Sequence, residues 1–430
     1  MFKYKKLISL FLSFLIFALN FDYSFTFAEE LNITATNAIA IESKTGQVLF
    51  DKDAYNKIYP ASTTKVWTAY LVIKQVQSLD EIVEVKNDVS WVEPSSMFLK
   101  VGEKFTVRQL LEVLMLKSAN DVAVVLAQYV SGSVDEFAKL MNEEAKKIGC
   151  NNTNFINSNG LPDENHYSTA YDMALIAKES LKSDILREIA NTEYISLPGN
   201  DVHPEPREYK NSNKFLTGGI DILYKGELID TKYNIVKGLK TGYTSAAGRC
   251  LLSNAIIDDT EVIVGVFNSQ GNEVYVDSRT IIDYSLENFK SRVIIDKDEF
   301  TASKSIMLSN KKIDGYIEED YAKVESNTSE VIDNNNYEYN VSFDEKVELP
   351  IKKDSIIGEV IVKENGEKID TIPLLATEDV EKPFITPVLF AIIVALFMLI
   401  LIFKQSINNI VENKQKRNKK VTSAVYGRRR

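Results

Sequence analysis

Hydrophobic and polar positions alternate along residues 38–53, on both sides of a Lys44-Thr45-Gly46 turn, and this pattern predicts a β-hairpin. Apolar residues then recur at helical spacing over 61–76. The same criteria predict helices over 107–116, 121–130, 134–148, 169–182 and 273–289, and strands over 234–244, 249–257 and 261–269. Strands, a helical block, and then strands with a last helix indicate a mixed α/β domain built on an antiparallel sheet.

The pattern changes after about residue 292. Residues 293–378 contain short alternating runs separated by turn residues, and these predict a small all-β domain. No cluster of reactive side chains stands out in it, so we expect it to act as a spacer. We therefore place a catalytic domain at 29–292 and a β-rich C-terminal domain at 293–380.

The N-terminal segment has the order of charges and apolar residues that is typical of secretory signal peptides. Three lysines precede an apolar run over 7–21, and Thr26 and Ala28 supply the small residues of a cleavage site. The apolar run is short for a membrane span. Residues 1–28 are therefore predicted to be a signal peptide cleaved after Ala28, with an uncleaved anchor as the alternative.

A second apolar segment, 384–403, has 20 residues without a charge, which is long enough for a transmembrane helix. The tail that follows, 404–430, carries nine basic residues and one glutamate. Basic residues that flank a span stay in the cytoplasm. The two ends together predict a single-pass protein of the cell membrane, with residues 29–383 extracellular and the tail cytoplasmic.

Charge and composition exclude several classes of function. The chain has a net charge of −11 although its tail is basic, so the exported region is strongly acidic and a poor binder of nucleic acid. Only two histidines are present, which argues against a histidine-rich metal site, and no cofactor is expected. Cys150 and Cys250, the two cysteines, allow one bridge but no disulfide scaffold.

Candidate chemistry begins at Ser62 and Lys65, which stand about one helical turn apart on the same face of the predicted helix. A serine hydroxyl is a weak nucleophile and needs a base. A lysine can be that base if burial and a neighbouring cation lower its pKa. Pro60 suits the first turn of a helix, where free amides and the helix dipole favour a developing oxyanion.

Ser118 and Asn120 form a second group, at a break between two predicted helices. The hydroxyl of Ser118 can relay a proton between a lysine and a leaving nitrogen. The side chain of Asn120 can hold both Lys65 and an amide of the substrate.

Lys240, Thr241 and Gly242 form a third group, on a predicted strand. Lys240 can supply positive potential and donate a hydrogen bond to Ser118, and Thr241 can offer its hydroxyl to a substrate carboxylate. Gly242 lets a substrate backbone approach the strand closely. The order of the three groups is the signature of penicillin-binding proteins and class A β-lactamases.

Two of these motifs occur a second time. The serine and lysine of 309–312 lie in the β-rich region, where we interpret them as a solvated loop. Lys44-Thr45-Gly46 precedes Ser62 and is interpreted as the hairpin turn. Both the order along the chain and the local pattern select the copies at Ser62 and Lys240.

With these motifs the sequence resembles the low-molecular-mass penicillin-binding proteins of the D-alanyl-D-alanine carboxypeptidase type. The resemblance covers about residues 35–380 and includes the blocks KSANDVAVVLA, NSNGLPDENHYSTAYDMALIAK and VKGLKTGYTSAAGRCLL. It implies the β-lactamase/DD-peptidase-like fold, an antiparallel sheet flanked by helices, followed by a small all-β domain.

The resemblance also implies a reaction. Ser62 would attack the carbonyl between the two terminal D-alanines of a peptidoglycan stem pentapeptide, and water would then hydrolyse the acyl-enzyme. Lys65 is implied as general base and Ser118 as proton relay. β-Lactam antibiotics are expected to inhibit the enzyme by acylating Ser62.

Recognition of the substrate is implied at the strand. Lys240 and Thr241 would bind the substrate carboxylate, and the backbone N–H groups of Ser62 and Tyr243 would form the oxyanion hole. Relatives often carry an arginine within the stretch 211–213, where this chain has Ser212, and Arg249 and Lys214 are the candidates to replace its charge. His166 is expected to be a hydrogen-bonded loop residue.

Three other functions are alternatives to this one. A class A β-lactamase needs a glutamate followed by asparagine four residues later, and none occurs between 120 and 200. A penicillin-binding sensor is disfavoured because the 27 residues of the tail are too few for a signalling domain. Transpeptidase and endopeptidase activities stay open, because they share the acyl-enzyme and differ only in the acceptor.

Overall fold

The computed structural model describes residues 31–305, 312–327, 336–344, 349–381 and 387–426. Two compact units divide the chain: the described residues of 1–294 and 321–331 form the first, and those of 295–320 and 332–430 form the second. The predicted signal peptide, 1–28, and the second serine motif at Ser309 lie outside the described residues.

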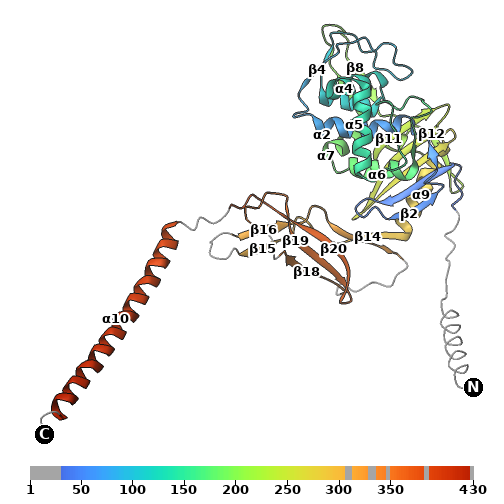
Figure 1. The fold of residues 1–430 in the computed structure, drawn as a ribbon. Coiled ribbons are helices and arrows are strands. Elements are labelled where there is room, and N and C mark those ends of the chain that lie inside the picture. Colours follow the sequence, from blue (N-terminus) through green and yellow to red (C-terminus); the bar gives the residue numbers. More distant parts are fainter. Residues whose placement is uncertain (1–30, 306–311, 328–335, 345–348, 382–386, 427–430) are drawn as a thin grey trace, which may run out of the picture. The chain divides into compact units, whose positions relative to one another are not determined.

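A five-stranded antiparallel sheet forms the centre of the first unit, with the strand order β11-β12-β13-β1-β2 (Figure 1). The strands are β1 Asn37–Glu42, β2 Val48–Lys52, β11 Val236–Thr244, β12 Gly248–Ile257 and β13 Thr260–Ser269. The hairpin β1–β2 and the strands β11 to β13 confirm the predicted pattern. β11 is an edge strand, so one of its sides is open to a further peptide.

Both faces of the sheet are covered, because successive residues of a strand point to opposite sides. Ile39 and Ile41 of β1 pack into the core beneath the helical block, whereas Ala38 and Ala40 pack into the core beneath α9. The helices are α2 Lys65–Gln75, α3 Val107–Leu116, α4 Asn120–Ser131, α5 Val134–Lys147, α6 Ala170–Ser180, α7 Asp184–Asn191, α8 Lys214–Thr217 and α9 Glu273–Asn288.

The break between α3 and α4 is fixed by local sequence. α3 begins with a capping box in which Thr106 and Gln109 each bond the backbone of the other. α3 ends at Leu116 and α4 begins at Asn120, so the predicted break falls on residues 117–119. Helix α4 ends at Gly132, whose φ of 80° lies in the left-handed region that glycine tolerates.

Several short elements were not predicted, because two to four residues cannot display a hydrophobic period. They include α8 and four two-stranded pairs. The pairs are β3 Lys57–Ile58 with β6 Ser168–Thr169, β4 Ile82–Glu84 with β5 Lys104–Thr106, β7 Tyr194–Leu197 with β8 Arg207–Lys210, and β9 Asp221–Tyr224 with β10 Glu227–Asp230.

The last part of the first unit is a strand pair from distant parts of the sequence. β14 (Phe289–Ile295) follows α9 and pairs with β17 (Tyr321–Ser326). Val324 of β17 packs against the core beneath α9. The chain therefore leaves the first unit, returns to it for β17, and leaves again.

The second unit contains a five-stranded sheet of order β15-β16-β20-β19-β18, which confirms the predicted β-rich domain. Its strands are β15 Ala302–Ser305, β16 Lys312–Tyr316, β18 Tyr337–Phe343, β19 Ile356–Glu364 and β20 Glu367–Ala376. Helix α10 (Pro387–Tyr426) follows, and its stretch Ala391–Asn418 is long and apolar enough to cross a membrane, with a mean hydropathy of 2.1 in its most apolar window.

Candidate active site

Ser62 and Lys65 lie where β3 gives way to helix. Ser62 belongs to the 3₁₀ turn η1 (Ala61–Thr64), and Lys65 is the first residue of α2. Nζ of Lys65 lies 3.0 Å from Oγ of Ser62. The expected proximity of the amine and the hydroxyl is thus present.

Lys65 is fully buried and its amine has two further partners. Nζ donates to Oδ1 of Asn120 at 2.6 Å and to the backbone oxygen of Asn159 at 2.5 Å. Burial, and secondly the charge of Lys240, hold the pKa of Lys65 well below its usual value. A neutral amine has two hydrogens and one lone pair. A neutral Lys65 that donates both hydrogens to these acceptors would direct its lone pair at the hydroxyl of Ser62.

Lys240 on β11 is a second buried lysine, and burial lowers its pKa to about 7. Its Nζ donates to the backbone oxygen of Thr241 at 3.1 Å. The predicted hydrogen bond from Lys240 to Ser118 is not among the contacts of the described residues. Lys240 acts on the site through its charge, which lowers the pKa of Lys65.

Ser118 stands in the break between α3 and α4 with a φ of 64°. This left-handed conformation is uncommon for a residue other than glycine. The loop is fixed on both sides, since Asn120 N donates to Ser95 O at 2.6 Å and Ser95 Oγ donates to Lys117 O at 3.1 Å. No hydrogen bond of the Ser118 hydroxyl is found within the described residues, so it is available to a ligand.

Gly242 brings β11 against η1. A Cβ on Gly242 would lie 3.1 Å from the backbone N of Ser62 and 3.2 Å from that of Thr63, which is tighter than ordinary contact. Because Gly242 has no side chain, β11 can pass this close to the backbone of Ser62. Tyr243, the next residue, is 56% exposed.

The block around Asn159 and His166 contributes contacts that were not predicted. Gly160 has a φ of +80°, and a Cβ there would lie 1.8 Å from the backbone oxygen of Ala61. His166 is buried, its Nδ1 accepts from Ile156 N at 3.2 Å, and its Nε2 lies 3.0 Å from the Thr64 hydroxyl. Nε2 therefore carries the proton, and burial lowers the pKa of His166 to about 4. His166 is a hydrogen-bonded loop residue, as expected.

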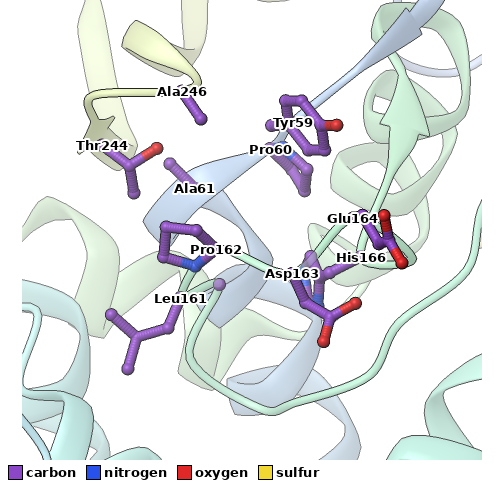
Figure 2. A pocket seen from close by; sticks show the side chains of 11 residues that line it. Tyr59, Pro60, Ala61, Leu161, Pro162, Asp163, Glu164, His166, Thr244 and Ala246 are labelled. Carbon is purple, nitrogen blue, oxygen red and sulfur yellow. The ribbon is translucent and has the colours of Figure 1, made fainter.

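A pocket of about 250 Å³ opens beside Ala61, the residue before Ser62, between the start of η1, the block 160–166 and the end of β11 (Figure 2). Its walls are largely apolar, with Pro60, Ala61 and Pro162 among them. Asp163 and Glu164 stand at its edge, and Thr244 and Ala246 close the opposite side.

Both cysteines are buried and free, so the single bridge that the sequence allows is not formed. Cys150 Sγ donates to the backbone oxygen of Asp172 at 3.4 Å, and burial raises the pKa of the Cys250 thiol to about 12. Neither thiol is a nucleophile under these conditions.

Comparison with known proteins identifies the class of enzyme that this fold and site define. Residues 24–271 match the family described as D-alanyl-D-alanine carboxypeptidase, and residues 289–382 match the family described as penicillin-binding protein 5, C-terminal domain. The chain belongs to this family of serine carboxypeptidases, whose members act through an acyl-enzyme and bind penicillin. The predicted family, fold class and enzyme activity are thereby confirmed.

Particular relatives support this assignment. The D-alanyl-D-alanine carboxypeptidase DacF of Bacillus subtilis is 30% identical over 83% of this chain and 89% of its own length. The crystal structure of penicillin binding protein 5 from Haemophilus influenzae shares the fold with a TM-score of 0.59, at 24% identity, over 82% of this chain and 99% of that one. The Streptomyces K15 DD-transpeptidase has a TM-score of 0.54 at 29% identity, and covers 60% of this chain and 98% of its own.

Proposed function

We propose that Ser62 is the nucleophile that removes the terminal D-alanine from peptidoglycan stem pentapeptides. The observation that carries this proposal is the buried amine of Lys65, whose Nζ lies 3.0 Å from Ser62 Oγ and also bonds Asn120 Oδ1 and Asn159 O. Lys65 takes the proton of Ser62 as Oγ bonds to the carbonyl carbon between the two D-alanines. The result is a tetrahedral oxyanion.

Collapse of the oxyanion releases the terminal D-alanine. Ser118 relays a proton from the Lys65 ammonium to the leaving nitrogen, and its free hydroxyl on a fixed loop supports this role. Water then attacks the acyl-enzyme ester, with Lys65 again as the base, and frees the Ser62 hydroxyl. A β-lactam antibiotic presents a carbonyl to the same hydroxyl and inhibits the enzyme by forming a persistent ester.

The oxyanion is proposed to bind the backbone N–H groups of Ser62 and Tyr243. The close approach of Gly242 to the backbone N of Ser62 supports this pairing. Asn120, already bonded to Lys65, has its amide N–H₂ available to a substrate carbonyl. Lys240 and Thr241 are proposed to face the C-terminal carboxylate.

The pocket beside Ala61 offers room for the stem peptide upstream of the scissile bond. It begins at Ala61 and Thr244, which flank the proposed oxyanion hole in the sequence. A substrate aligned along the open edge of β11 would pass directly into it.

The remaining organisation is proposed from the sequence together with α10. We propose a signal peptide at 1–28, a catalytic domain at 29–292, a β-rich domain at 293–380, a transmembrane helix at 384–403 and a cytoplasmic tail at 404–430. The apolar stretch of α10 is unburied in the structure, which supports a membrane anchor, and the basic tail of the sequence supports a catalytic domain outside the cell.

The test compares full-length wild type with Ser62→Ala in detergent, and measures D-alanine release from a pentapeptide together with labelling by fluorescent penicillin. Ser62→Ala should lose both signals, by at least about 10⁴-fold in release, because nothing else can form the ester. Ser309→Ala, which changes the serine of the second motif, is the matched control and should keep both.

Normal D-alanine release by Ser62→Ala would refute the assignment. Penicillin labelling of the wild type without D-alanine release would instead indicate a transpeptidase that needs an acceptor amine. Rapid turnover of penicillin would indicate a β-lactamase.

A further inference from the structure

Arg249 is an exposed cation beside the proposed site. It lies on β12 directly opposite Tyr243 of β11, so the two side chains share one face of the sheet. Its guanidinium carbon lies 4.6 Å from the centre of the Tyr243 ring. Because alternate residues of a strand face the same way, Thr241 lies on this face too.

The hydroxyl of Ser212 meets Thr241, and the hydroxyl of Tyr275 bonds the backbone on either side of that contact. Ser212 Oγ lies 2.7 Å from Thr241 Oγ1. Tyr275, at the start of α9, accepts from Lys214 N at 3.1 Å and donates to Ser212 O at 3.5 Å. The charge of Arg249 reaches this cluster, because it opposes the rise that burial causes in the pKa of Tyr275.

Among the described residues, Arg249 and Lys214 are the cations near the cluster apart from the two buried lysines of the site. Burial holds the pKa of Lys65 well below its usual value and lowers that of Lys240 to about 7, so Lys240 is only partly charged at neutral pH. An arginine is always protonated and presents up to five N–H donors in a planar fork that matches a carboxylate. Within the described residues Arg249 has no carboxylate partner, and its guanidinium group stacks on the ring of Tyr243.

We propose that Arg249 binds the C-terminal carboxylate of the substrate, with the hydroxyls of Thr241 and Ser212 as its co-donors. This proposal rests on the proposed function. It assigns recognition of the negative charge of the substrate to Arg249, on the strand next to β11. Ser212 donates without charge, and Arg249 supplies the charge from the other side of Thr241. The acid end of β-lactam antibiotics would meet the same three groups.

The test measures kcat and KM of the full-length protein with a pentapeptide ending in D-Ala-D-Ala, and with the same peptide capped as its C-terminal amide. Arg249→Met should lower kcat/KM for the acid peptide by about 10- to 100-fold, mostly through KM, since a charged hydrogen bond is lost. The amide peptide should change less than about twofold. Arg249→Lys should recover part of the loss, because it restores charge without the planar fork.

Lys214→Met is the matched control, because Lys214 is the other nearby cation and contributes its backbone N–H to the cluster. It should leave both peptides within about twofold. Arg249 is exposed, so its replacement removes no core contact, and a thermal melt verifies folding.

A pH series gives a second readout. In Arg249→Met the cation of β11 next to Thr241 is Lys240, whose charge is lost as the pH rises through about 7. The KM of this variant for the acid peptide should therefore rise between pH 6 and 8 more steeply than that of the wild type.

Three results would overturn the proposal. Equal losses on the acid and amide peptides would show that Arg249 only supports the structure. A loss with Lys214→Met but none with Arg249→Met would assign the charge to Lys214. If the wild type releases D-alanine and Arg249→Met has unchanged kinetics, this inference alone is refuted. If the wild type releases no D-alanine, the proposed function is refuted as well.

Discussion

The tripeptide Lys-Thr-Gly occurs twice, and the two copies meet opposite environments. At 44–46 it forms the turn between β1 and β2, where Thr45 is exposed and both its N–H and its hydroxyl bond Glu42. At 240–242 it lies within β11, where Lys240 is buried and Gly242 is so close to η1 that a Cβ on it would lie 3.1 Å from Ser62 N.

The difference shows that the residues supply only the chemical groups, whereas their surroundings decide what the groups can do. Burial lowers the pKa of Lys240 to about 7 and lets its charge act on Lys65. In the turn, Thr45 is used to satisfy a neighbouring carboxylate, and Gly46 is required for a φ of +74°. A motif search alone scores the two copies equally.

The largest expected effect is a difference in activity between substitutions of the two lysines of the tripeptide. Lys240→Met should lower kcat/KM for the pentapeptide by about 100-fold or more, because it removes the charge near the carboxylate. It should also raise the pKa of Lys65, whose depression depends partly on Lys240, so the acid limb of the pH–rate profile should move to higher pH.

Lys44→Met is the paired control and should leave activity within about twofold. Methionine matches lysine in length, so the buried variant should fold, and a thermal melt checks this. Equal losses in the two variants would contradict the distinction between the copies.

The two glycines of the tripeptide should respond differently to substitution by alanine. Gly242→Ala places a Cβ 3.1 Å from Ser62 N, so η1 must shift, and acylation by penicillin should slow by roughly 10- to 100-fold. Gly46→Ala should cost about 1 kcal/mol of stability through its positive φ, with acylation unchanged. Stopped-flow acylation and thermal melts measure the two effects, and slow acylation in Gly46→Ala would be inconsistent with a purely structural turn.

The smallest expected difference concerns the threonines. Thr241→Val should raise KM for the acid peptide by roughly 3- to 10-fold, as expected for one neutral hydrogen bond, and should release Ser212 from its partner. Thr45→Val should lower stability by about 1 kcal/mol without changing KM, because its hydroxyl bonds Glu42 and Gln47 N within the same turn. Steady-state kinetics of both variants test this difference, and a change in KM for Thr45→Val would contradict it.

Much of the fold was accessible from sequence because its main elements are long and periodic. Helix α3 was predicted at its observed limits, and β11 to β13 within two residues. α7 and the short strand pairs were missed, since their residues are few and partly exposed.

The candidate site was only partly accessible. Ser62, Lys65 and Asn120 were predicted together and are found in contact. The backbone oxygen of Asn159 was not foreseen, because any residue carries a carbonyl and only the fold selects which one meets Lys65. The stacking of Arg249 on Tyr243 likewise depends on the register between β11 and β12, which a single sequence does not fix.

The excursion of the chain between β14 and β17 has a consequence for protein engineering. A gene fusion that replaces everything after residue 292 would discard β17 along with the second unit. The last three residues of β14 would be cut away as well, Val324 would be missing from the core beneath α9, and strand edges would be left open to aggregation. A chimera with a foreign C-terminal region therefore needs two junctions, one on each side of an insertion, with 321–327 kept from the parent.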